Sequence, residues 1–352
     1  MGAYERLAEK HGYRHSGWYR RILEFLMTPA QAEVADALPG SFEEVAAKTG
    51  LSIEEVKVEI DALFRKGVVI SKDFHTLEGA RFCPDVMRLH DATEASRLTG
   101  EIYGEKAPHL WRLWEEFCQK EYYAELARIA REMEVPPTRI VPVYRTIQDI
   151  PGISPYDDVR EILKAAPLIA VVPCSCRSQA EKKDVIVEAC IQLGRNAEYA
   201  IARGSGRQID YAEALAIVDK ADDDGAIHRT TNWQSLSWGL LSSCTKDACL
   251  ILTPLFQYGV PIDKRVEKSR FEASVNEELC NGCEVCVARC QFDAIEMVQS
   301  HDSKGLKALI DPEKCWGCGS CVIKCEPEAL SLRLVRPLDY IPAEKPAAYR
   351  HT

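Results

Sequence analysis

The 352-residue sequence has no long apolar run. No stretch approaches the ~18 to 20 apolar residues of a membrane helix. The first residues, from Met1 to Arg6, also lack the apolar core of a secretory signal peptide. We therefore expect a cytoplasmic protein without membrane insertion.

An excess of positive charge is missing as well. The 44 Lys and Arg residues are outnumbered by 54 Asp and Glu residues, which leaves a net charge of -10. Because non-specific affinity for nucleic acid comes from neutralising phosphates with Lys and Arg, nucleic acid is not an expected partner. The chain contains neither a P-loop nor a G-x-G-x-x-G motif after a strand, so no nucleotide cofactor is predicted.

Cysteine, in contrast, is abundant. In a chain of this length without a secretory signal, 15 cysteines indicate metal ligands or redox groups rather than a disulfide framework. Two runs, CNGCEVCVARC from Cys280 and CWGCGSCVIKC from Cys315, each have the spacing C-x2-C-x2-C-x3-C. Three cysteines at this spacing let one loop wrap a cuboidal iron-sulfur cluster, while the fourth points away and ligates a second cluster.

The spacing therefore predicts two [4Fe-4S] clusters with crossed ligands. The predicted first set is Cys280, Cys283, Cys286 and Cys325, and the predicted second set is Cys315, Cys318, Cys321 and Cys290. A pair of structural zinc sites is the alternative. Zinc, however, needs two pairs of cysteines per site instead of an interleaved three plus one.

The two runs belong to an internal duplication with an offset of 35 residues. This offset sets Val275 against Ile310, Gly282 against Gly317, and Ala294 against Ala329. Each copy is expected to form a short strand, a cluster loop, a helical turn and a second strand. The paired glycines suit loops in which backbone amides approach inorganic sulfide.

With these motifs, the segment from Phe271 to Arg336 resembles the bacterial dicluster ferredoxins over nearly its whole length. The resemblance implies a ferredoxin-like domain that carries electrons. The sequence departs from that family after the fourth cysteine of each run. In the first run Gln291 replaces the usual proline, and in the second run the proline, Pro327, lies one residue further along the chain. The departure concerns the exit of each loop and not the ligands.

Three helical segments followed by two short strands are predicted in the N-terminal part. The second and third helices have serine N-caps, capping-box glutamates and terminal glycines, at Ser41, Glu44 and Gly50 and at Ser52, Glu55 and Gly67. This order resembles a winged helix-turn-helix domain, a fold that often binds DNA. The third helix, however, carries four acidic residues against three basic ones, so we expect a protein-docking or structural module.

The next segment, from about His90 to Met133, is predicted to be helical. An apolar stripe that includes Leu110, Trp114 and Phe117 indicates a packed core face. Prolines at positions 136, 137 and 142 predict a linker after it.

Five further cysteines form a candidate third site. A buried strand is predicted from Ile169 to Pro173, and Cys174 and Cys176 follow it directly. The two cysteines share a face if the segment stays extended. Cys190 is expected on a helix, and Cys244 and Cys249 flank a short polar loop. A third [4Fe-4S] cluster, a zinc ion, a redox-active thiol pair and inert buried cysteines all remain open, because four thiolates are enough for either metal.

A second resemblance covers about Pro155 to Leu255 and rests on PCSCR at 173 to 177, RGSGRQI from Arg203, and GAIH at 225 to 228. This part is similar to a poorly characterised family of anaerobic iron-sulfur proteins, in which such a domain precedes a dicluster ferredoxin. Members of that family carry a denser cysteine cluster where this chain has Ser242 and Ser243. The ligand set of the third site is therefore left open.

The predicted fold is multidomain α+β. It comprises a winged-helix-like domain at 1–85, a helical segment and linker at 86–150, and a middle α+β cysteine-containing PCxCR domain at 151–262. A dicluster ferredoxin domain follows at 263–336, and a tail at 337–352 is expected to lie along a partner or to stay disordered.

We expect an electron-transfer protein or subunit of an anaerobic oxidoreductase complex, with a larger oxidoreductase as redox partner. No acid-base pair or nucleophile indicates catalysis by the chain itself. Two alternatives remain open. One is a redox- or oxygen-sensing transcriptional regulator that uses the winged helix. The other is a self-contained iron-sulfur reductase.

Overall fold

The computed structural model describes residues 1–236, 239–299 and 305–349. The chain divides into two compact units, each assembled from separate stretches of sequence. Unit 1 comprises Met1–Tyr123, Ala170–Lys182 and Ala197–Gln208, and unit 2 comprises Ala124–Ile169, Lys183–Asn196 and Ile209–Thr352. Both contain helices and strands, in agreement with the predicted α+β class, whereas the division into five contiguous segments stays a prediction.

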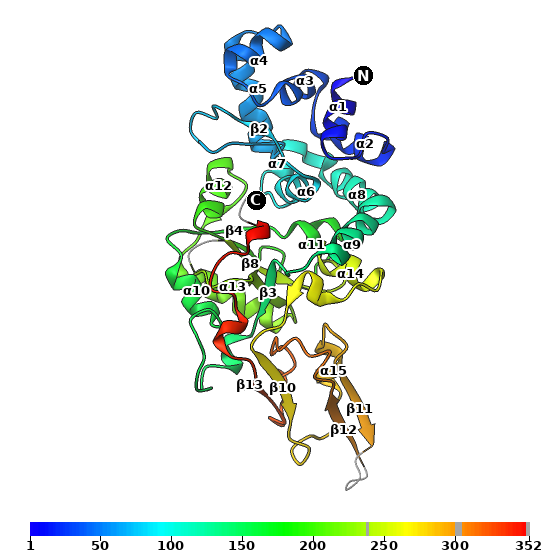
Figure 1. Cartoon of the computed structure of the whole chain (residues 1–352), viewed down its shortest axis with the longest axis vertical. Coiled ribbons are helices and arrows are strands. Elements are labelled where there is room, and N and C mark those ends of the chain that lie inside the picture. Colours follow the sequence, from blue (N-terminus) through cyan, green and yellow to red (C-terminus); the bar gives the residue numbers. More distant parts are fainter. Residues whose placement is uncertain (237–238, 300–304, 350–352) are drawn as a thin grey trace. The chain divides into compact units, whose positions relative to one another are not determined.

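Unit 1 is mainly helical (Figure 1). Its helices are α1 (Ala3–Lys10), α2 (Gly17–Leu26), α3 (Pro29–Ala37), α4 (Phe42–Thr49), α5 (Ile53–Lys66), α6 (Val86–Glu94), α7 (Thr99–Tyr103), α8 (Ala107–Phe117), α11 (Ser175–Gln179) and most of α12 (Arg195–Arg203). Its strands form two antiparallel pairs, β1 (Val69–Ile70) with β2 (Arg81–Phe82) and β4 (Ile169–Val172) with β6 (Arg207–Gln208).

The predicted caps of α4 and α5 are confirmed. Ser41 and Ser52 each accept a hydrogen bond from the backbone N–H three residues later, and Gly50 and Gly67 end the helices in the left-handed conformation. The predicted stripe on α8 is confirmed as a core face, because Leu110, Trp114 and Phe117 are fully buried. The winged-helix resemblance itself stays a prediction.

Unit 2 is built on strands that are neighbours in the order β5-β8-β7-β3-β9. The strands are β3 (Thr138–Val141), β5 (Cys190–Leu193), β7 (Ile227–Thr231), β8 (Gly239–Cys244) and β9 (Val266–Glu267). The accompanying helices are α9 (Tyr123–Glu132), α10 (Val159–Ala165), α13 (Tyr211–Asp223) and α14 (Leu252–Gln257). Strand β3 lies in the segment predicted as a linker, with Pro137 and Pro142 just outside its ends, where a missing N–H does not interrupt the ladder.

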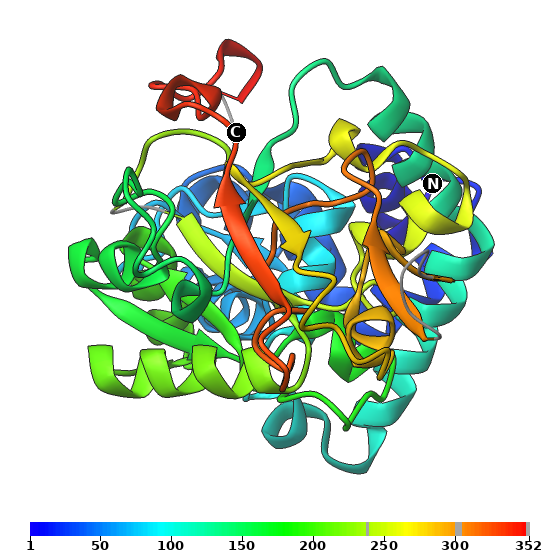
Figure 2. The same ribbon diagram turned by 90° about the horizontal axis from the view of Figure 1, so that it is seen from below.

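The C-terminal part of unit 2 consists of two antiparallel strand pairs (Figures 1 and 2). Strand β10 (Phe271–Val275) pairs with β13 (Leu330–Leu334), and β11 (Ile295–Gln299) pairs with β12 (Leu306–Ile310). The bounds of β12 and β13 repeat those of β10 and β11 at the offset of 35 seen in the sequence. Each pair therefore joins one strand from each copy, and the two copies are intertwined.

The tail differs from the expectation. Ile341 is 2% exposed, the backbone N–H of Gln234 donates to the carbonyl of Pro342 at 2.8 Å, and Tyr340 donates to Glu267 at 2.5 Å. The segment through Tyr349 is thus ordered on its own chain, because it supplies apolar and aromatic side chains to a surface of unit 2. The last three residues of the predicted tail lie outside the described part. Among the described helices, none combines the length and apolarity that crossing a bilayer requires.

Candidate iron-sulfur sites

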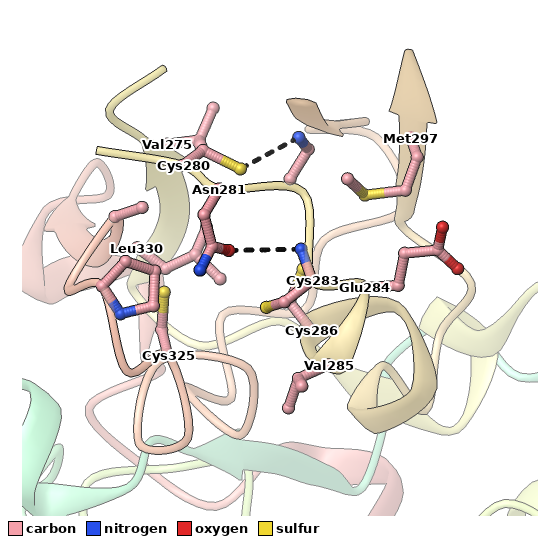
Figure 3. Close-up of a pocket in the computed structure, with 13 residues that line it drawn as sticks. Val275, Cys280, Asn281, Cys283, Glu284, Val285, Cys286, Met297, Cys325 and Leu330 are labelled. Atoms are coloured by element: carbon pink, nitrogen blue, oxygen red, sulfur yellow. Dashed lines mark hydrogen bonds between the residues drawn. The ribbon is translucent and has the colours of Figure 1, made fainter. Parts of the chain in front are cut away.

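Four cysteines from both copies of the duplicated unit line a first cavity. Cys280, Cys283 and Cys286 come from the first run and Cys325 from the second. Figure 3 shows the four side chains around a common space. The side-chain oxygen of Asn281 accepts a hydrogen bond from the backbone N–H of Cys283 at 3.2 Å and so holds the loop in its turn. The structure brings together all members of the predicted first set.

A second cavity has the converse lining. Cys315, Cys318 and Cys321 come from the second run and Cys290 from the first. The space that no protein atom fills is ≈ 330 Å³ in the first cavity and ≈ 350 Å³ in the second. Near-equal cavities are what a duplicated unit should form, and each holds four sulfur ligands, the number that a [4Fe-4S] cluster takes.

Each cluster loop depends on one tightly packed glycine. Gly282 has a φ of +76°, and a Cβ placed there would lie 2.6 Å from the carbonyl oxygen of Leu306. Gly317, its counterpart, has a φ of +67°, and a Cβ would lie 2.1 Å from the carbonyl oxygen of Phe271. Since only glycine combines a left-handed backbone with so close an approach, the loops can pass directly against the strands.

Backbone amides point at cysteine sulfur in a pattern that follows the duplication. The N–H of Ala273 donates to Sγ of Cys315 at 3.4 Å, and the N–H of Ala308 donates to Sγ of Cys280 at 3.5 Å. The donors and the acceptors are each 35 residues apart. Hydrogen bonds to ligand sulfur stabilise added negative charge and so raise the reduction potential of a cluster.

The two cavities differ in exposure. Burial raises the pKa of Cys318 to about 12 and also raises the pKa values of Cys315 and Cys321. These thiols hold their protons at neutral pH until a metal displaces them, so cluster binding releases protons. In the first set, by contrast, Cys283 is exposed. The second cavity is therefore the inner one.

Arg289 is a functional candidate that we did not predict. Its side chain lines the second cavity and donates to the carbonyl oxygens of Ser320 at 2.8 Å and Asp222 at 2.7 Å. A guanidinium in this place fixes the cluster loop against the end of α13 and adds positive charge beside the sulfurs. The available signal was its position directly before Cys290, the ligand that crosses between the copies.

The five middle cysteines fall in different parts of the fold. Cys174 and Cys176 belong to unit 1, and the other three, Cys190, Cys244 and Cys249, belong to unit 2. Cys244 ends β8 and Cys249 follows a turn, which confirms the expected loop between them.

Two local predictions for this set are wrong. Cys190 begins strand β5 and is not on a helix, because the segment after the lysine turn pairs with β8. Cys176 lies in the short helix α11, with Cys174 as its N-cap residue, so these two cysteines are not on one face of an extended segment.

Comparison with known proteins agrees with this geometry. Residues 279–329 match the family model of the 4Fe-4S dicluster domain. The C-terminal domain is therefore of the dicluster iron-sulfur class and binds two [4Fe-4S] clusters. No curated protein and no solved structure matches the chain.

Proposed function

We propose that this chain is an electron-transfer component of an anaerobic oxidoreductase system, with the crossed sets of Cys280, Cys283, Cys286 and Cys325 and of Cys315, Cys318, Cys321 and Cys290 as cluster ligands. The observation that carries the proposal is the pair of four-cysteine cavities built by intertwined copies of one unit. Both cavities border one apolar core, which includes Ala273, Ile295 and Leu330. Two centres in one small core suit the passage of electrons from one to the other.

The protein itself positions the centres and sets their environment. When bound, each [4Fe-4S] cluster takes up and gives back one electron. The apolar core excludes water from the space between the two cavities, and the N–H groups of Ala273 and Ala308 point at ligand sulfur. Arg289 lines the inner cavity and adds positive charge there, which raises the potential of that centre.

We include a third centre in the proposal, as a [4Fe-4S] cluster or a zinc ion with ligands among Cys174, Cys176, Cys190, Cys244 and Cys249. Its support comes from unit 2, where Cys244 and Cys249 belong to the same buried cluster as Phe292 and Trp316. Cys290 and Cys318, which line the inner cavity, pack against that cluster. A metal held there would extend the chain of centres beyond the inner cavity.

Metal and sulfide analysis of protein purified without oxygen tests both parts. About eight irons per chain and two reduced-cluster EPR signals are expected from the two ferredoxin centres. About twelve irons indicate a third cluster, and eight irons with one zinc indicate a zinc site. Protein that holds two clusters but does not reduce any one-electron acceptor after dithionite treatment would contradict the proposed function.

A further inference from the structure

The two cluster cavities have very different surroundings within unit 2. The inner cavity is covered by protein: the N–H of Val143 donates to the carbonyl of Cys318 at 2.9 Å, and Gln291 donates to the carbonyl of Gly225 at 3.1 Å. Arg289 adds its bonds to α13 on the same side. Cys283 of the outer cavity, in contrast, is exposed to solvent.

Two exposed apolar residues flank the exposed cysteine in the sequence. Leu279 is 50% exposed and Val285 is 40% exposed, and they lie four residues before and two residues after Cys283. Val285 and Glu284 also line the outer cavity and are labelled beside Cys283 in Figure 3. Large apolar side chains left in water at the mouth of a redox site favour contact with another protein.

Exposed carboxylates lie close to the outer ligands in the sequence. They belong to the segments that carry the outer ligands, and they are Glu277, Glu278, Glu284, Glu326 and Glu328. We call these five glutamates with Leu279 and Val285 the outer face.

Cations near the two cavities contact groups other than these carboxylates. Lys307 donates to the carbonyl of Cys280 at 2.5 Å, Lys324 pairs with Asp223 at 3.1 Å, and Arg289 donates to backbone carbonyls. Among the described residues, none of the five glutamates of the outer face forms an ion pair with a Lys or Arg side chain. The five carboxylates outnumber the single positive charge of Lys307, so the outer face carries a net negative charge.

We infer that the outer face is the docking site of a redox protein whose own cofactor opening is apolar and bordered by Lys and Arg. The inference rests on the proposed function. Charge complementarity orients the two proteins before contact, and the apolar centres then exclude water between the cofactors. Electrons enter or leave the chain through the outer cluster. The inner cluster exchanges electrons with the outer one from within unit 2.

The test uses cytochrome c, a basic haem protein that accepts one electron, and hexacyanoferrate(III), an anionic acceptor. The variant Glu277→Gln/Glu278→Gln/Glu284→Gln removes three charges from the outer face. Its matched control, Glu54→Gln/Glu78→Gln/Glu105→Gln, removes three exposed charges from unit 1. Reduced proteins are mixed with each acceptor in stopped flow at several salt concentrations.

The outer-face variant should react with cytochrome c about tenfold more slowly at low salt and lose most of its salt dependence. It should react faster than wild type with hexacyanoferrate(III). The control should stay within about twofold of wild type for both acceptors.

Equal effects in the two variants, or no effect in either, would overturn the inferred docking site. Iron content and EPR of each variant establish that the clusters are intact. A wild-type protein that reduces neither acceptor contradicts the proposed function instead, so the two failures can be told apart.

Discussion

At the scale of single residues, Cys290 and Cys325 decide how the two clusters are held. Each lies at the end of one run but lines the cavity formed by the other run. A sequential arrangement, in which each run holds its own cluster, would place them differently. The two arrangements predict different outcomes when cysteines are removed in pairs.

We expect Cys283→Ala and Cys325→Ala each to remove about half of the reduced-cluster EPR signal. The double variant C283A/C325A should lose no more than either single variant, because both residues serve the outer cluster. The double variant C283A/C290A should lose nearly all of the signal. Equal signals in C283A and C283A/C290A would contradict crossed ligation. Because Cys283 is exposed, its removal leaves no core cavity.

Glu94 is a second informative residue. Its pKa is raised to about 8, chiefly by burial, while the charge of His90 lowers the pKa and that of Asp91 raises it. Neither carboxylate oxygen has a hydrogen-bond partner in the described part of the chain. The folded protein therefore keeps this group protonated at pH values where the unfolded chain ionises it, at an ordinary pKa of 4.5.

A raised folded pKa means that stability falls as the pH rises towards 8. Between pH 6 and pH 8, Glu94 should lower the free energy of unfolding by up to about 1.4 kcal/mol per pH unit. Glu94→Gln should remove this slope and be more stable than wild type at pH 8, whereas the exposed Glu105→Gln should keep it. Urea unfolding followed by tryptophan fluorescence under anaerobic conditions measures the slope. An unchanged slope in Glu94→Gln would show that the carboxyl group is already ionised in the fold.

At the scale of elements, the strands and the ligands cross in the same way. Strand β10 of the first copy pairs with β13 of the second, and β11 pairs with β12. Neither copy can therefore form its strand pair or complete its cavity alone. The two copies should therefore fold together. A substitution in one cluster loop should reduce cluster binding mainly in the cavity that this loop lines.

Gly317→Ala tests the close approach of the inner loop to β10. The added Cβ would lie 2.1 Å from the carbonyl oxygen of Phe271 and 2.3 Å from Oγ of Ser269. We expect loss of the inner cluster, seen as about half of the wild-type iron content. Gly259→Ala is the matched control, because its φ of +60° is equally unfavourable to alanine while nothing lies within 4 Å of the new atom. If both variants keep full iron content, the loop is not constrained as the structure indicates.

At the scale of the whole molecule, charge separates an electron carrier from a DNA-binding regulator. The net charge is -10, and the exposed side of α5 carries Glu54 and the 67% exposed Val58. Its cations are partly neutralised, since Lys57 pairs with Glu54 at 3.0 Å and Arg65 pairs with Glu101 at 3.2 Å. This helix presents little free positive charge to phosphate.

We therefore expect no gel shift of random-sequence duplex DNA by micromolar protein at about 50 mM salt, a condition that favours non-specific binding. The result should be the same for cluster-loaded and cluster-free protein. A salt-dependent shift that changes with cluster state would instead support the regulator and weigh against the electron-carrier proposal.

The sequence by itself determined the local features whose cause is local. Serine caps and terminal glycines defined α4 and α5, since a cap acts within one turn. The cysteine spacing and the duplication predicted the two clusters, because three ligands of each lie in one short loop. The prediction of a helix at Cys190 was wrong, because a short segment with mixed polarity becomes a strand only when a partner such as β8 is present to pair with it.

Only the tertiary structure decided which cluster site is inner and which is outer. The two cysteine runs are nearly equivalent in sequence, and their difference arises from long-range contacts such as those of Arg289 with α13 and Val143 with Cys318. Only the tertiary structure also showed that the tail is ordered. Its composition is typical of a disordered segment, but Ile341 is buried in unit 2. Burial and long-range hydrogen bonds depend on residues far apart in the chain, and no local pattern records them.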